Sequence, residues 1–89
     1  MTIQEFIDGL NAKFEGQYYF SIEKPGIKYT RVIQSFKSHR SSRSAFCFVD
    51  AEGNIYKPDS WERPAKGVRS TLTTVNLDNV DPYGTWLYQ

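Results

Sequence analysis

The sequence predicts an α+β domain in which an N-terminal amphipathic helix packs on an antiparallel sheet of three to five strands. Three observations indicate this fold class. Apolar residues recur at helical spacing near the N terminus, two hairpin patterns follow, and aromatic residues make up 16% of the chain. Because aromatic side chains bury the largest area per residue, they can supply the core of a chain of 89 residues, which we expect to be one domain over residues 1–89.

The N-terminal helix is predicted by one apolar stripe with the spacing i, i+3, i+4, i+7 and i+11. The stripe consists of Ile3, Phe6, Ile7, Leu10 and Phe14. Thr2 followed by Glu5 matches a capping box, and Gly16 stands where a left-handed residue would end the helix. Gly9 lowers the intrinsic stability of the helix by up to about 1 kcal/mol relative to alanine, so the helix needs a sheet to pack against.

The sheet is expected to consist of two hairpins built from aromatic and β-branched runs. The first hairpin turns at Lys24-Pro25-Gly26 and the second at Glu52-Gly53-Asn54. The segment Ser38–Ser44 between them contains no apolar residue and predicts a loop. The expected strands are 18–22, 27–36, 45–50 and 55–57.

The pattern changes after residue 58. Pro64 suits the first turn of a short second helix over residues 64–72, and the β-branched residues near its end argue against a longer one. Asp81-Pro82-Tyr83-Gly84 predicts a turn. The last four residues before the C terminus, Thr85–Tyr88, are expected to form a final strand or an extended tail packed on the sheet.

Charge is distributed unevenly along the chain, although the formal net charge is only +1. Residues 24–43 carry six basic residues and no acidic one, which creates a local positive field. A second group of cations accompanies the expected second helix. The candidate anion-binding residues are Lys24, Lys28, Arg31, Lys37, Arg40, Arg43, Lys57, Lys66 and Arg69.

These cations have two interpretations that the sequence leaves open. Basic residues at strand edges block edge-to-edge pairing, in which case they form only a solvated edge. Alternatively, they form a surface that follows phosphates, because arginine binds phosphate oxygens bidentately and neighbouring aromatic rings stack on bases. The candidate stacking residues are Tyr19, Tyr29 and Tyr56.

The residue patterns of catalytic and metal sites are missing from the sequence. Cys47 lies between Phe46 and Phe48, which predicts a buried, unreactive thiol. His39 is the only histidine and lies in a polar segment, so we expect no metal site and no cofactor. The sequence contains neither a phosphate-binding glycine loop nor a nucleophile elbow, and we expect a protein that is not an enzyme. Without an apolar run that would span a membrane or form a signal peptide, the expected location is the cytoplasm.

The most distinctive stretch is Phe48–Leu72, FVDAEGNIYKPDSWERPAKGVRSTL. It resembles a run, FVD…G…YK…SW…PAK…R, shared by short uncharacterised proteins that bacteriophages encode. This resemblance implies a phage origin and no particular activity. Within the run, Trp61 is interpreted as a core plug or as part of an interface, and Lys57, Lys66 and Arg69 as cations around the start of the second helix.

The order of elements also resembles that of the double-stranded-RNA-binding domain, which runs helix, three strands, helix. Arg63, Lys66 and Arg69 would then stand at the start of the second helix. Glu62 and Pro64 interrupt the run of lysines that is usual there. The resemblance concerns topology and does not by itself establish a function.

Together these features predict a small non-enzymatic phage protein that binds nucleic acid through residues 24–43 and 57–69. The alternative is a protein–protein module, either a host-factor inhibitor or a virion component, without a nucleic-acid role. A contiguous basic face would favour the first function, and an exposed apolar patch would favour the second.

Overall fold

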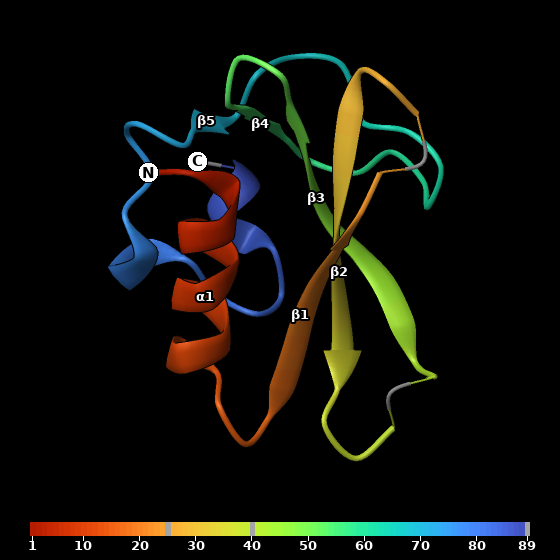
Figure 1. The fold of residues 1–89 in the computed structure, drawn as a ribbon, viewed down its shortest axis with the longest axis vertical. Coiled ribbons are helices and arrows are strands. Elements are labelled where there is room, and N and C mark those ends of the chain that lie inside the picture. Colours follow the sequence, from red (N-terminus) through yellow and green to blue (C-terminus); the bar gives the residue numbers. More distant parts are fainter. Residues whose placement is uncertain (25, 40, 89) are drawn as a thin grey trace.

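The computed structural model describes residues 1–24, 26–39 and 41–88, and it confirms the α+β class (Figure 1). One helix packs on one antiparallel five-stranded sheet with the order β1-β2-β3-β4-β5. Two short 3-10 helices, η1 and η2, follow the sheet. The elements are α1 (Ile3–Lys13), β1 (Tyr18–Glu23), β2 (Tyr29–Phe36), β3 (Arg43–Asp50), β4 (Asn54–Tyr56), β5 (Ser70–Thr71), η1 (Leu77–Asn79) and η2 (Thr85–Tyr88).

Helix α1 forms as its sequence predicts. The Thr2 side chain accepts a hydrogen bond from the backbone of Glu5, and the Glu5 side chain accepts one from the backbone of Thr2, which completes the capping box. Phe6 and Leu10 are fully buried against the sheet. Packing requires a glycine at position 9, because a Cβ atom on Gly9 would overlap the Cδ1 atom of Leu77 in η1. The glycine therefore lets the C-terminal segment approach the helix.

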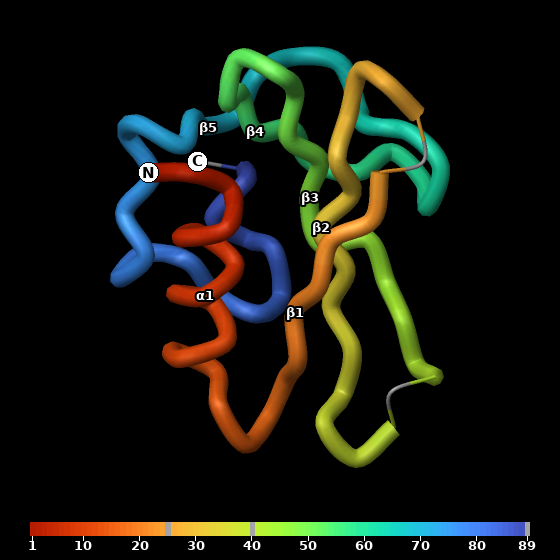
Figure 2. The backbone as a smooth tube through the Cα atoms, viewed as in Figure 1, coloured from red at the N-terminus to blue at the C-terminus, as the bar shows by residue number. Residues whose placement is uncertain are grey.

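The main core lies between the sheet and the two elements that cover one of its faces. Figures 1 and 2 show α1 and the blue C-terminal segment together on that face. Phe6 of α1 lies 6.4 Å from Trp86 of η2, measured between ring centroids, and Trp86 lies 5.8 Å from Phe46 of β3. Cys47 is fully buried in this core, which confirms its predicted burial.

The outer edge of the sheet is protected by a side chain of the helix. Asn11 donates from Nδ2 to the carbonyl oxygen of Phe20, at 2.9 Å, and accepts at Oδ1 from the amide of the same residue, at 2.7 Å. Since β1 is an edge strand, these two bonds occupy backbone groups that could otherwise pair with another chain.

The predicted second helix over residues 64–72 is wrong. After β4 the chain forms turns, a single bridge between Pro58 and Pro64, and then the short strand β5. Backbone bonds follow this segment along β4: the amide of Ala65 donates to Lys57, and the amide of Arg69 donates to Ile55. Pairing with the sheet thus replaces helical hydrogen bonding. Because residues 64–72 form no helix, the order of elements does not match that of the double-stranded-RNA-binding domain.

The predicted last strand over residues 85–88 is also wrong, because these residues form η2. The Asp81 carboxylate accepts hydrogen bonds from the amides of Thr85, at 3.3 Å, and Trp86, at 2.9 Å. A carboxylate that accepts amides in this way nucleates a helical turn. In the part of the chain that the structure describes, no helix is long and apolar enough to cross a membrane.

Candidate nucleic-acid interface

Arg31 belongs to the interior of the fold and not to the predicted binding surface. Its exposed fraction is only 3%, because Trp61, in the segment after β4, covers its guanidinium. The guanidinium donates from Nη1 to Glu23 at 2.9 Å and from Nε to the carbonyl oxygen of Trp61 at 2.6 Å. It also stacks on the ring of Trp61, 4.3 Å from its centroid. A cation held in this way is not available to phosphate.

Arg43 completes the same cluster at the surface. Its Nη2 donates to the second oxygen of Glu23 at 2.9 Å, and its guanidinium lies 5.1 Å from the centroid of Trp61. Trp61 is thus contacted by two arginines and remains partly exposed. The Arg31, Arg43, Glu23 and Trp61 group, called here the arginine clamp, holds the segment after β4 on the sheet.

The remaining predicted cations do not form one patch. Lys28 precedes β2 and Lys37 follows it, so the full length of this eight-residue strand lies between them. Lys24 and Lys66 are exposed, and the predicted role of Arg40 lies outside the described residues. Lys57 and Arg69 do converge: Lys57 Nζ lies 4.4 Å and the Arg69 guanidinium 6.0 Å from the ring centroid of Tyr88.

The predicted stacking tyrosines are part of the sheet surface. Tyr29 and Tyr56 pack edge to face at 5.5 Å, and both are half-buried, as is Tyr19. The Tyr56 hydroxyl donates to Asp50 Oδ2 at 2.8 Å, and this bond to the carboxylate raises the pKa of Tyr56 to about 12. By contrast, Tyr83 and Tyr88, which the sequence did not single out, have exposed fractions of 82% and 66%.

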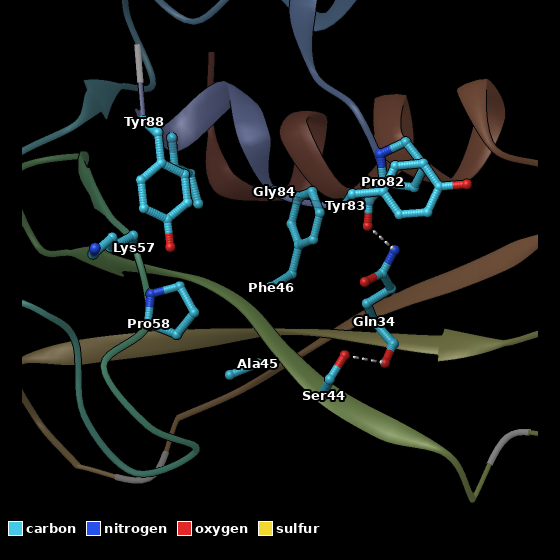
Figure 3. A pocket seen from close by; sticks show the side chains of 11 residues that line it. Gln34, Ser44, Ala45, Phe46, Lys57, Pro58, Pro82, Tyr83, Gly84 and Tyr88 are labelled. Carbon is cyan, nitrogen blue, oxygen red and sulfur yellow. Dashed lines mark hydrogen bonds between the residues drawn. The ribbon is translucent and has the colours of Figure 1, made fainter.

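Tyr83 and Tyr88 border a groove of about 200 Å³, called here the β3 groove. Its floor is formed by β2 and β3, its rim by the C-terminal segment, and one end by the start of the segment after β4 (Figure 3). Figure 3 shows Lys57 and Tyr88 at one end and Tyr83 and Gln34 at the other. The lining residues are Gln34, Ser44, Ala45, Phe46, Lys57, Pro58, Pro82, Tyr83, Gly84, Leu87 and Tyr88.

A second hollow of about 170 Å³ extends the β3 groove along the sheet. Gln34 and Ser44 line both hollows, so the two hollows adjoin at these residues. The second one reaches Arg43 and the half-exposed ring of Phe36. The combined surface therefore offers aromatic rings and a cation at each end.

The rim of the groove is fixed by one carboxylate. Asp81 accepts hydrogen bonds from the amides of Tyr83 and Trp86 and from the Thr85 hydroxyl, at 3.0, 2.9 and 2.7 Å. Partial burial raises the pKa of Asp81, but the bonds from Thr85 and the backbone amides outweigh it and hold the pKa below its usual value. Gly84 has a φ of 79°, which the tight turn requires. The sequence signal for this rim is Asp81-Pro82-Tyr83-Gly84, which predicts a turn but not the groove beside it.

None of the described residues that line the groove is a histidine, cysteine, aspartate or glutamate. Among the described residues, no three of the His, Cys, Asp and Glu side chains are placed to hold a metal ion. Burial raises the pKa of the Cys47 thiol, which keeps it protonated and unreactive. Nδ1 of His39 lies 3.2 Å from the hydroxyl of Ser38. Within the described part of the chain, this is the one hydrogen-bond contact of the His39 ring.

These features define a small α+β protein with an aromatic surface groove. The chain belongs to DUF7717, a family of unknown function, whose family model matches residues 3–89. Searches among curated proteins and among solved structures gave no match. The family assignment covers the run Phe48–Leu72 together with nearly all of the chain.

Proposed function

We propose that this protein is a non-enzymatic nucleic-acid-binding protein that binds a single strand along the β3 groove. The observation that carries the proposal is the pair of exposed rings, Tyr83 and Tyr88, at the borders of a groove that ends at Lys57. The resemblance of Phe48–Leu72 to phage proteins supports a phage origin and a role in the cytoplasm of the host cell.

The chemistry of the groove favours a single strand. Proteins that bind single strands combine aromatic side chains, on which bases stack, with cations that follow the phosphates. Tyr83 and Tyr88 supply exposed rings, and Lys57 and Arg69 lie beside Tyr88, where they can reach a phosphate next to a stacked base. A duplex keeps its bases stacked inside, so exposed rings beside a groove match a strand whose bases are free.

The predicted basic segment contributes to this proposal in part. Arg43 lines the second hollow beside Phe36, so a strand leaving the groove would meet it, and Lys37 directly follows Phe36 in the chain. Lys24, Lys28 and Lys66 lie elsewhere on the surface. We assign to these three a contribution to the long-range field that attracts a polyanion, without direct contact.

Fluorescence anisotropy with labelled single-stranded and duplex oligonucleotides tests the proposal. For three to five phosphate contacts, affinity for the single strand should fall about 20- to 130-fold between about 50 and 200 mM salt. Each of Tyr83→Ala and Tyr88→Ala should weaken binding by about 5- to 150-fold, because each removes one stacking ring. The matched control is Ile27→Ala, which trims an even more exposed apolar side chain at the β1–β2 turn and should leave affinity unchanged.

Two results would overturn the proposal. One is no binding to either oligonucleotide at tens of micromolar protein and low salt. The other is binding that the double variant Tyr83→Ala, Tyr88→Ala leaves unchanged while Lys28→Ala weakens it, because the anion would then bind at the β1–β2 turn.

A protein–protein module is the second candidate, favoured by apolar side chains outside the groove. Ile27 is 93% exposed at the turn between β1 and β2, and Val68 is half-exposed after β4. Ile27 also borders a hollow with Tyr29 and Phe48. Binding of such a partner, a host factor or a virion component, would be lost in the Ile27→Asp variant and retained in the Tyr83→Ala variant.

A further inference from the structure

The orientation of the Gln34 side chain is fixed by its partner. Its Nε2 donates to the carbonyl oxygen of Pro82 at 2.8 Å. Because a carbonyl oxygen can only accept, the nitrogen must face Pro82 and the side-chain oxygen must face the other way. Figure 3 shows this oxygen directed away from Pro82, on the side where Phe46 lies. Gln34 therefore presents an acceptor to the β3 groove.

Ser44 adds to this polarity. Its hydroxyl lies 3.5 Å from the backbone oxygen of Gln34 and donates to it, so its lone pairs remain for a ligand (Figure 3). Gln34 and Ser44 are also the two residues common to both hollows, so they lie where the β3 groove and the second hollow adjoin. Between the rings and cations at its ends, the groove is thus lined by hydrogen-bond acceptors.

Acceptors at this position distinguish the bases by their exocyclic groups. When the 4-position of the base faces the Gln34 oxygen, the amino group of cytosine donates to it, whereas the carbonyl oxygen of thymine in the same place faces it unfavourably. The two pyrimidines have the same ring size and the same single-stranded backbone. Thymine has the larger stacking area because of its C5 methyl group, so tighter binding of cytosine would report hydrogen bonding and not stacking area.

We propose, building on the nucleic-acid binding proposed above, that the β3 groove prefers bases with an exocyclic amino group and that Gln34 is the residue that reads it. Wild-type protein should bind oligo(dC) about 2- to 10-fold more tightly than oligo(dT) of equal length, the effect of about one hydrogen bond. The phosphate contacts are the same for both, so the salt dependence should be the same.

Two variants of one position separate the acceptor from the contact to Pro82. Gln34→Met and Gln34→Glu both lose the donor to Pro82, but only Gln34→Glu keeps an acceptor. Gln34→Met should bind oligo(dC) and oligo(dT) equally. Gln34→Glu should keep the preference for oligo(dC) while binding both more weakly, because its charge repels phosphate. Circular dichroism confirms that both variants fold.

The outcomes distinguish this inference from the proposed function. Binding of neither oligonucleotide would overturn both. Binding of both with equal affinity, or tighter binding of oligo(dT), would overturn the base preference and leave single-strand binding in place. A preference for oligo(dC) that survives in Gln34→Met would overturn the role of Gln34.

Discussion

Replacing Arg31 by lysine tests whether the arginine clamp is a structural element, as its burial indicates. The lysine keeps the positive charge but has one compact ammonium in place of a planar fork. It cannot donate to Glu23 and to the Trp61 carbonyl from two separate nitrogens, and it loses the flat stacking between Trp61 and Phe48. One hydrogen bond to a charged group and one buried cation–π contact are lost, about 2–4 kcal/mol together.

The matched control is Arg43→Lys, which changes the other arginine on the same carboxylate. The side chain of Arg43 is 44% exposed, against 4% for Arg31, so its exposed ion pair contributes less than about 1 kcal/mol. Thermal unfolding followed by tryptophan fluorescence gives the comparison. Arg31→Lys should lower Tm by roughly 8–30 °C, at about 4–8 °C per kcal/mol for a domain of this size. Equal shifts for the two variants would refute the burial argument.

Three further predictions concern the core, the thiol and the turn after β3. Leu10→Ala should lower the free energy of unfolding by about 2–5 kcal/mol, measured by urea titration, because Leu10 is fully buried; a loss below about 1 kcal/mol would contradict the packing of α1. Native Cys47 should react with a thiol reagent only after denaturant is added, and immediate labelling would contradict its burial. Partial burial raises the pKa of Asp50, but bonds from Asn54, Tyr56 and Glu52 outweigh it and lower the pKa. Because the folded pKa lies below the unfolded one, Asp50 contributes stability above about pH 4 that is lost as pH falls through the folded pKa. Asp50→Asn should therefore flatten acid unfolding below about pH 4, and an unchanged acid profile would contradict this role.

The parts of the fold that the sequence predicted correctly are governed by local pattern. The stripe from Ile3 to Phe14 and the cap at Thr2 specify α1 without reference to the rest of the chain. The hairpins are similarly local, since each turn joins adjacent strands. The strand boundaries moved by only a few residues, and β3 begins at Arg43 inside the segment expected to be a loop.

The predictions that failed depended on contacts between distant residues. No helix forms at Pro64, because the backbone there pairs with β4. Residues 85–88 form a helical turn because the Asp81 carboxylate accepts hydrogen bonds from their amides. Arg31 carries no local sign of burial, since the segment that covers it comes 30 residues later and its carboxylate partner lies on the neighbouring strand. The β3 groove has the same origin, because Gln34 and Pro82 are 48 residues apart in the chain. The positions of basic residues in the sequence do not show which of them become buried or ion-paired in the fold.

The run Phe48–Leu72, the most distinctive stretch of the sequence, is explained mostly by folding. Phe48 and Trp61 hold Arg31 between them, and Asp50 binds the turn after β3 together with the Tyr56 hydroxyl. A protein that shares these residues needs them to fix the segment after β4 on the sheet, whatever it binds.

The residues proposed to bind a base and a phosphate are mostly outside that run. Gln34 and Ser44 precede it and Tyr83 and Tyr88 follow it, while Lys57 is the residue of the groove's cationic end that lies within it. Proteins can therefore share the run and the fold while differing in the groove. The base preference tested at Gln34 is for this reason a property of this chain, to be measured on it and not transferred from the family.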